Sequence, residues 1–249
     1  MKSHLLTLFL FSMILASCNL TFELGIEPLQ SSPTRLSAPS IATLIPPPTA
    51  TGTPVEHNFR DDFSGNLQDG WTWVNEIPDL WTITSSGWLQ IIGQDPSLIR
   101  DFQTNLLCRP APSGEYQVTV HLYAEPIENF QQATLYLYQD VENYIAINRG
   151  YCGSCLEGGS GVYMEYKKSG IFETFMIGTK DPDVYLQLVS QYDEVTSYYA
   201  LALDFWRRLG SIGNYLEEPQ VCLGVSNVDL DGIDNDLVGR FDYIEISLH

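Results

Sequence analysis

The fold follows from the stretch Tyr116-Gln117-Val118-Thr119-Val120-His121-Leu122-Tyr123. Val118, Val120 and Leu122 form an apolar set, and the residues between them are polar. Successive side chains of a β-strand point to opposite faces, so this two-residue period predicts a strand with one buried and one polar face.

The same alternation recurs along the rest of the chain. It covers the ranges 133–138, 144–148, 162–166, 184–189, 197–203, 221–225 and 241–246. Turn-forming residues separate several of these ranges: Gln139-Asp140, Lys168-Ser169-Gly170, Asp181-Pro182-Asp183 and Asp231-Gly232. The range 201–209 also fits a short helix, although it is brief and lacks a capping residue. Many short strands between turns predict an all-β sandwich or barrel.

The composition is poor in charge and strongly acidic. The 249 residues include 12 Lys and Arg against 31 Asp and Glu, which gives a formal net charge of -19. Binding to nucleic acid requires a basic face, and adsorption to anionic lipid requires a polybasic patch, so the sequence argues against both. Hydrophobic residues at 44% and aromatic residues at 12% indicate a large core rather than an acidic disordered chain.

Residues 1–17 have the organisation of a signal peptide. Lys2 supplies a positive charge, and the apolar run over 5–16 is too short to span a bilayer. The run ends in Leu15-Ala16-Ser17-Cys18, which resembles the bacterial lipobox, in which the cysteine is diacylated and becomes the mature N-terminus. We therefore expect a lipid on Cys18 and an extracytoplasmic protein anchored at the cell surface or envelope. The alternative is an ordinary secretory peptide cut nearby, with Cys18 left as a free thiol.

Residues 18–57 have the composition of a tether. Proline, serine and threonine recur in Ser31-Ser32-Pro33-Thr34, Pro46-Pro47-Pro48-Thr49 and Thr51-Gly52-Thr53-Pro54. Such a stretch cannot bury enough apolar surface to offset its ordering entropy, and repeated proline stiffens it toward polyproline II. We expect a disordered linker over 18–57 that holds one domain, residues 58–249, away from the membrane.

Several motifs of this domain resemble those of a known family. They are Phe59-Arg60-Asp61-Asp62-Phe63, Gly87-Trp88-Leu89-Gln90-Ile91, Leu135-Tyr136-Leu137-Tyr138-Gln139-Asp140 and Phe241-Asp242-Tyr243-Ile244-Glu245-Ile246. Their order and spacing resemble the concanavalin A-like jelly-roll domains at the C-terminus of family 43 β-xylosidases, and the related "regulator of enolase" domain of unknown function. The resemblance implies an all-β, two-sheet antiparallel jelly-roll sandwich that is associated with sugars. In those xylosidases hydrolysis belongs to a separate catalytic domain.

Four cysteines remain when Cys18 is lipidated, an even number in an oxidising compartment. Four cysteines allow three pairings. We favour Cys152–Cys155 within one loop and Cys108–Cys222 between strands, because the second bond would join distant parts of a sandwich. A four-thiolate zinc site and a redox-active pair are the alternatives. One C-x-x-C with scattered partners is thin support for zinc, and no βαβ pattern supports a redox role.

Two acidic groups are candidates for structural calcium. In the range 227–236, carboxylates surround a glycine turn as at the start of a calcium loop: Asp229, Asp231 and Asp234. The twelfth-position glutamate of an EF-hand is missing there, and the alternative is a solvated acidic loop. The resemblance to jelly rolls implies a second site between the first and last strands, formed by Asp61 or Asp62 with Asp242. Ordinary surface carboxylates are the alternative at that second site.

Aromatic residues on strands are the candidates for sugar binding, since flat rings stack on pyranose faces while polar groups bind hydroxyls. Two strand faces stand out, one with Tyr136 and Tyr138 and the other with Tyr163 and Glu165. They would form a binding platform if they point outward. The alternative is that they belong to the core.

No catalytic motif is present. The sequence has no G-x-S-x-G elbow, no H-E-x-x-H and no E-x-D-x-x-E pattern on a strand. We therefore predict a lipid-anchored surface protein with no catalytic residues and no cofactor beyond structural calcium, whose partner is a glycan or polysaccharide. A structural or protein-interaction module of the cell envelope is the alternative, followed by a glycoside hydrolase with an unrecognised carboxylate pair. The sequence carries no signal for an oligomeric state.

Mass spectrometry of the mature N-terminus checks the lipid anchor. We expect the chain to begin at a diacylated Cys18, and Cys18→Ser to release the protein from the membrane fraction because the attachment point is lost. A mature chain with an unmodified Cys18 would contradict the lipobox interpretation.

Overall fold

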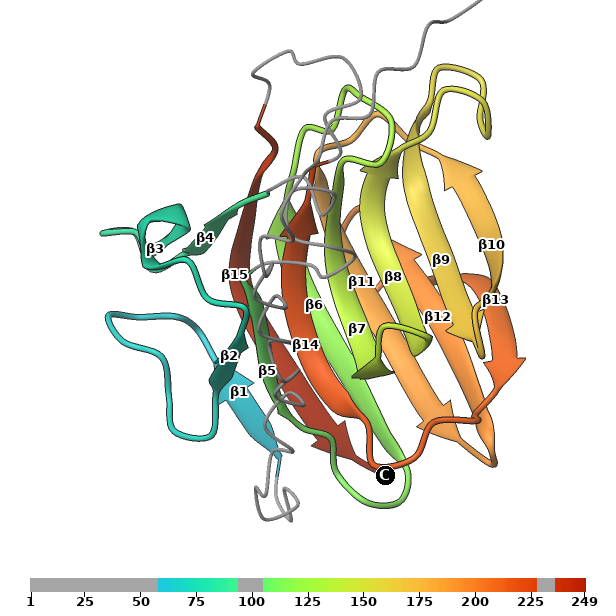
Figure 1. Cartoon of the computed structure of the whole chain (residues 1–249), viewed down its shortest axis with the longest axis horizontal. Coiled ribbons are helices and arrows are strands. Elements are labelled where there is room, and N and C mark those ends of the chain that lie inside the picture. Colours follow the sequence, from blue (N-terminus) through green and yellow to red (C-terminus); the bar gives the residue numbers. More distant parts are fainter. Residues whose placement is uncertain (1–57, 94–104, 228–235) are drawn as a thin grey trace, which may run out of the picture. The chain divides into compact units, whose positions relative to one another are not determined.

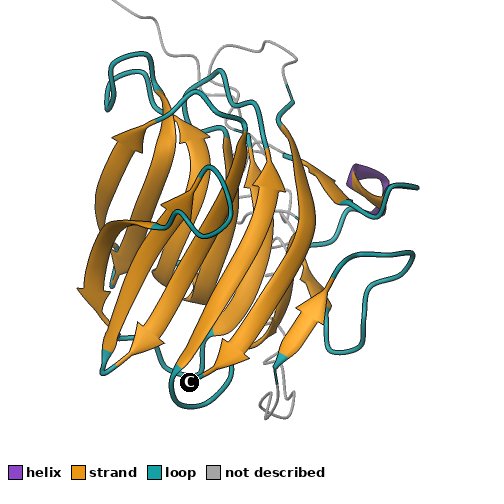
Figure 2. Ribbon diagram, turned by 180° about the vertical axis from the view of Figure 1, so that it is seen from behind, coloured by secondary structure: helices purple, strands orange, loops and turns teal. Residues whose placement is uncertain are grey.

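The computed structural model describes residues 58–93, 105–227 and 236–249. Over these ranges the chain forms two antiparallel sheets that face each other (Figure 1). Figure 2 shows the same layers from behind, with the short 3-10 helix η1 (Pro78–Leu80) at one edge. The predicted two-sheet, all-β sandwich is confirmed. Among the described residues, no helix has the length and apolar character needed to cross a membrane.

The first sheet has eight strands in the order β13-β12-β11-β6-β15-β4-β3, and β1 pairs with β15 beyond the end of β4. The bounds are β1 (Phe59–Asp61), β3 (Trp81–Ile83), β4 (Leu89–Ile92), β6 (Tyr116–Tyr123), β11 (Asp183–Gln191), β12 (Glu194–Ala200), β13 (Arg207–Gly213) and β15 (Val238–Leu248). The first and last strands of the domain therefore lie side by side.

The second sheet has seven strands in the order β10-β9-β8-β7-β14-β5-β2. The bounds are β2 (Thr72–Val74), β5 (Leu106–Pro110), β7 (Gln132–Asp140), β8 (Asn143–Tyr151), β9 (Ser160–Lys168), β10 (Ile171–Gly178) and β14 (Gln220–Ser226). Strands β7, β8, β9 and β10 follow one another as hairpins, whereas β14 and β5 join from distant parts of the chain.

Strand β6 is central to the first sheet, where it pairs with β11 and β15. Its apolar set, Val118, Val120 and Leu122, is fully buried in the core between the sheets, as the alternation predicts. The second sheet supplies its own set to the same core, including Leu135 and Leu137 of β7. Removal of these apolar faces from water contributes roughly 25 cal/mol per Å² and holds the two layers together.

The strand expected over 197–203 is too long. The strand β12 ends at Ala200, and the following residues divide into a turn and the start of β13 rather than forming a helix. Leu201 and Leu203 are 46% and 54% exposed, so their apolar character does not report a buried face. The alternation also misses β10, whose apolar side chains lie exposed at the edge of the second sheet.

Two hairpins depend on positive φ at both central turn residues. Ser169 and Gly170, at φ 50° and 81°, join β9 to β10, and Tyr192 and Asp193, at 51° and 60°, join β11 to β12. This backbone is that of a type I′ turn, whose twist matches that of antiparallel strands. The first turn is the predicted one, and the second contains no glycine to mark it in the sequence.

Both favoured disulfides are present. Cys108 of β5 stands directly opposite Cys222 of β14, and the bond between them joins residues 114 apart in sequence. Cys152 and Cys155 are bonded within the loop after β8, at a sequence separation of 3. A cross-link that closes a longer loop removes more entropy from the unfolded chain, so we expect the first bond to stabilise the fold more.

Two pairs of alanine substitutions test this difference. Loop-closure entropy predicts that Cys108→Ala with Cys222→Ala lowers the free energy of unfolding by about 5 kcal/mol. Cys152→Ala with Cys155→Ala is the matched control and is expected to cost about 2 kcal/mol. Urea denaturation of both double variants measures the difference, and equal losses would contradict the argument.

Candidate functional site

The four predicted sugar-binding residues lie on one surface of the second sheet, the face that points away from the core between the sheets. Tyr136 and Tyr138 come from β7, and Tyr163 and Glu165 come from β9, with β8 between them. Intervening residues such as Leu137 point into the core, so the alternation directs these four side chains outward. We call this surface the outer face of the second sheet.

One half of the outer face is apolar. A cluster separate from the main core forms there from Leu106, Cys108, Tyr136, Ala146 and Cys222, with Val74, Tyr138 and Tyr144 packed around it. The rings of Tyr136 and Tyr144 meet edge to face, with their centroids 5.8 Å apart, which is a favoured aromatic geometry. This half therefore carries tyrosine rings beside the Cys108–Cys222 disulfide, of which Tyr136 is only 8% exposed and Tyr138 and Tyr144 are partly buried.

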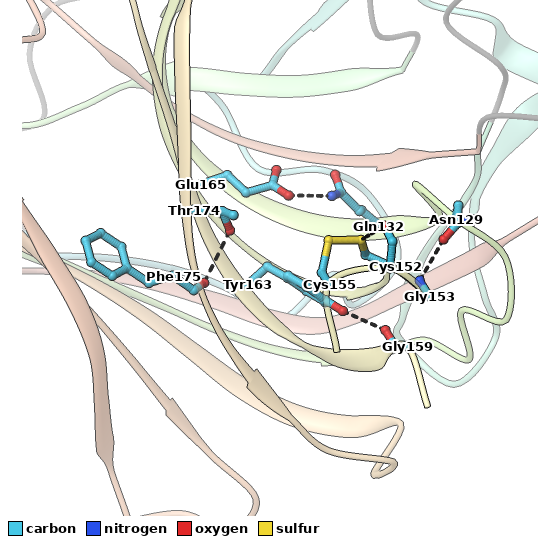
Figure 3. Close-up of a disulfide and its surroundings, with 11 residues drawn as sticks. Asn129, Gln132, Cys152, Gly153, Cys155, Gly159, Tyr163, Glu165, Thr174 and Phe175 are labelled. Carbon is cyan, nitrogen blue, oxygen red and sulfur yellow. Dashed lines mark hydrogen bonds between the residues drawn. A yellow bond between two sulfur atoms is a disulfide. The ribbon is translucent and has the colours of Figure 1, made fainter. Parts of the chain in front are cut away.

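The other half is polar. Gln132 donates a hydrogen bond from Nε2 to Oε1 of Glu165 at 2.7 Å (Figure 3). Thr134 stands opposite Asn148, and both are fully buried. Among the described residues, Thr134 Oγ1 and the side-chain Oδ1 of Asn148 have no hydrogen-bond partner, whereas the side-chain amide of Asn148 faces the Glu165 carboxylate. An enclosed polar group without a partner costs about 1–3 kcal/mol, so these atoms mark a place where a further polar partner would be stabilising.

Burial raises the pKa of Glu165 to about 7. The nearby side-chain amides of Gln132 and Asn148 oppose this shift, because they favour the carboxylate. Near neutral pH the carboxyl group is therefore present in both forms, and the outer face can offer it as a hydrogen-bond donor or acceptor.

Tyr163 has a structural role on this face. Its hydroxyl donates to the backbone oxygen of Gly159 at 2.6 Å, and the same oxygen accepts from the backbone N–H of Cys152 at 2.8 Å. Figure 3 shows how this contact joins the disulfide-closed loop to β9. Because Tyr163 is only 3% exposed and its hydroxyl is engaged, it supports the polar half rather than offering a free ring.

The carboxylate of Asp61, one of the predicted calcium ligands, is engaged by the chain itself. It accepts hydrogen bonds from the backbone N–H groups of Phe63 and Gln68, at 2.9 and 3.1 Å, and from Nε1 of Trp71 at 2.9 Å. The guanidinium of Arg109 provides a favourable positive charge nearby. Asp61 thus holds the segment that follows β1 in place.

Asp62 and Asp242, the other ligands predicted for calcium between the first and last strands, contact other side chains, and calcium at this site stays a prediction. Asp62 forms an ion pair with Arg60 at 2.7 Å, and Asp242 pairs with Nδ1 of His121 at 2.9 Å. Within the described ranges, no group of three or more histidine, cysteine or acidic side chains is placed to hold a metal ion. The acidic loop lies outside the described residues, so calcium there stays a prediction: Asp229, Asp231 and Asp234.

Sequence reasoning missed Gln132, Thr134 and Asn148. The alternation that singled out Tyr136 and Tyr138 places Gln132 and Thr134 on the same face of β7, so a signal for them was present. Nothing in the sequence indicated that β8 carries Asn148 to the position opposite Thr134, because that depends on strand order and register.

The two facing antiparallel sheets define a concanavalin A-like β-sandwich. The sequence profile of one family, described as the beta xylosidase C-terminal concanavalin A-like domain, matches residues 60–224. The match covers more than half of the chain, and the chain belongs to this family. The resemblance expected from the sequence is confirmed. A search of curated proteins finds no significant match.

Solved structures share the fold. The GH43 protein BlXynB from Bacillus licheniformis superposes with a TM-score of 0.66 and 19% identity, over 76% of this chain and 39% of that one. The xylan β-1,4-xylosidase from Bacillus halodurans gives 0.60 and 20%, over 76% and 38%. The β-glucanase of Bacillus licheniformis gives 0.57 and 12%, over 78% and 100%. At these identities the likeness shows the fold, and this chain spans about two-fifths of the length of the first two proteins.

Glu165→Gln tests the raised pKa of the outer face. The folded state keeps the Glu165 proton up to about pH 7, whereas the unfolded chain releases it near the ordinary value of 4.5. The folded state therefore binds more protons between these values, and the contribution of this group to the free energy of unfolding falls as the pH rises. Glutamine does not ionise, so we expect the stability of the variant relative to wild type to increase from about pH 5 to about pH 8.

Urea denaturation at several pH values measures this relative stability. Glu157→Gln, in the exposed disulfide loop, is the matched control. A stability difference for Glu165→Gln that does not change with pH would contradict the raised pKa.

Proposed function

We propose that this protein is a non-catalytic carbohydrate-binding module, displayed at the cell surface through a lipid on Cys18. The observation that carries the proposal is the outer face of the second sheet. There the rings of Tyr136 and Tyr138 lie next to enclosed side-chain oxygens of Thr134 and Asn148 that have no partner among the described residues. A sugar ring presents an apolar face and a rim of hydroxyls, so its recognition needs both kinds of group together.

The arrangement along β7 fits such a ligand. Gln132, Thr134, Tyr136 and Tyr138 follow one another on the same side of the strand, so the face changes from polar to aromatic along its length. The carboxyl group of Glu165, held by Gln132, adds a group that can donate or accept. Membership in a family named for β-xylosidases, and likeness in fold to a xylosidase and a glucanase, support a saccharide as the ligand.

A binding role is favoured over hydrolysis by the number of acidic groups. Glycosidases use two carboxyl groups that flank the scissile bond. At the described outward positions of β7, β8 and β9 around Thr134 and Asn148, Glu165 is the one acidic side chain. Its engagement with Gln132 suits a positioning group for a bound hydroxyl.

The alternative of a protein-interaction module is favoured by a different observation. The edge strand β10 exposes Ile171, Phe172, Phe175 and Ile177, between 38% and 67% each. An exposed apolar edge strand can pair with another chain. This surface is separate from the enclosed polar atoms, so the two functions are tested by different variants.

Thr134→Val separates binding from stability. Valine removes the unpartnered hydroxyl while keeping the shape of the side chain, so we expect unfolding stability to be unchanged or slightly higher. Loss of one hydrogen bond of about 1 kcal/mol to a sugar hydroxyl is expected to weaken binding about fivefold. Affinity gel electrophoresis in xylan and in β-glucan measures binding, with the exposed Tyr192→Ala as control.

Migration of the wild-type protein without retardation in both polysaccharides would contradict the proposal. Equal retardation of Thr134→Val and wild type would show that Thr134 does not contact the polysaccharide. Asn148→Leu, which removes the unpartnered Oδ1 together with the amide that faces Glu165, is then the second variant to be compared.

A further inference from the structure

A pocket of about 440 Å³ lies on the opposite side of the molecule, on the outward face of the first sheet, the sheet nearer the viewer in Figure 2. Strand register brings four of its residues into one row across neighbouring strands. Asp183 of β11 and Arg240 of β15 both stand opposite Tyr123 of β6, on its two sides. Arg240 in turn stands opposite Gln90 of β4. Four strands that are distant in sequence therefore build one continuous lining.

The turn before β4 lines the pocket and orients the backbone of its tryptophan. The backbone N–H of Trp88 donates to Oγ1 of Thr84 at 3.1 Å, and the backbone N–H of Thr84 donates to the carbonyl of Trp88 at 2.9 Å. The hydroxyls of Thr84 and Ser86 also hydrogen-bond to each other at 3.0 Å. Trp88 is half-buried, lines the pocket, and has its ring centroid 5.5 Å from that of His121.

The acidic wall is held by His121. Nε2 of His121 contacts Oδ1 of Asp183 at 2.5 Å, and its Nδ1 contacts Oδ2 of Asp242 at 2.9 Å. The imidazole ring stacks on Tyr185, with centroids 4.2 Å apart and planes 8° apart. Asp183 is thus oriented through one oxygen, and its Oδ2 accepts no hydrogen bond from a described residue.

The opposite wall supplies donors. Arg240 donates from Nε to Oε1 of Gln90 at 3.3 Å and lies over the Tyr123 ring at 5.8 Å. Its terminal Nη atoms and the Nε2 of Gln90 donate to no other described residue. The pocket therefore combines an acceptor on Asp183, donors on Arg240 and Gln90, the hydroxyls of Thr84 and Ser86, and the indole ring of Trp88. Such a combination is expected of a site for a ligand with many polar groups.

We propose that this pocket is a second saccharide site, which takes an uncharged sugar residue stacked on Trp88. The charged side chains that line it are one acid and one base, Asp183 and Arg240, so the pocket has no net charge to select an ion. The volume suits a ligand larger than a single small ion, within the range of small-molecule sites. The inference shares with the proposed function only the class of ligand, because the two surfaces belong to different sheets.

The experiment follows each surface separately in the full mature chain. Isotope-labelled protein is titrated with xylotriose and with cellotriose, and NMR records the indole N–H of Trp88 for the pocket and the side-chain amide of Asn148 for the outer face. Trp88→Phe and Asn148→Leu assign the two signals. The indole of Trp81, which is bonded to Glu76 and does not line the pocket, is the internal control.

Saturable movement of the Trp88 signal with an unmoved Trp81 signal is the expected result. Arg240→Ala is expected to weaken that titration about tenfold through lost hydrogen bonds while the Asn148 titration is unchanged. Trp88→Ala is expected to abolish the pocket site without changing the Asn148 titration.

The remaining outcomes separate the two proposals. Movement of Asn148 with no movement of Trp88 overturns the second site and leaves the proposed function in place. Movement of Trp88 alone upholds the second site and overturns the assignment of the outer face. No movement of either signal with both trisaccharides overturns both.

Discussion

The alternation of side chains along each strand is the constraint on which the rest of this structure depends. Two sheets packed face to face take one side of every long strand into a shared core, and the other side of each sheet is left to interact with something else. In β6 the residues Val118 and Val120 enter the core, and His121 lies on the opposite face. In β7 the same division separates Leu137 from Tyr136 and Tyr138.

Neither outward face is a simple solvated surface. The face of the second sheet carries its own apolar cluster, which includes the Cys108–Cys222 disulfide. The face of the first sheet carries His121 between two carboxylates and stacked on Tyr185. Such contacts hold the surrounding side chains in place, and preorganisation of this kind would reduce the entropy lost if either face binds the proposed ligand.

Three of the acidic side chains at the start and end of the domain are engaged by the chain itself. Asp61 accepts three hydrogen bonds from the chain, Asp62 pairs with Arg60, and Asp242 pairs with His121. Each of these carboxylates is therefore stabilised by N–H groups or a nearby side chain. Glu165 shows the contrary case, because burial raises its pKa and makes its charge conditional on pH.

Much of the fold could be predicted because its signals are local. The period of two in β6 identified a strand and its buried face, and the turn at Ser169 and Gly170 was marked by residues that favour it. The strand β10 and the end of β12 could not be placed in this way. Their apolar residues lie at a sheet edge or in a turn, where hydrophobicity no longer reports burial.

The sequence by itself determined most of the long central strands, which face of each is apolar, and which cysteines could join distant strands. Only the tertiary structure decided which strands are neighbours and in what register. Thr134 meets Asn148, and Asp183 meets the row that contains Arg240, because of strand order. The physical reason is that alternation is a property of a single strand, whereas pairing is set by the summed contacts of segments far apart in the chain.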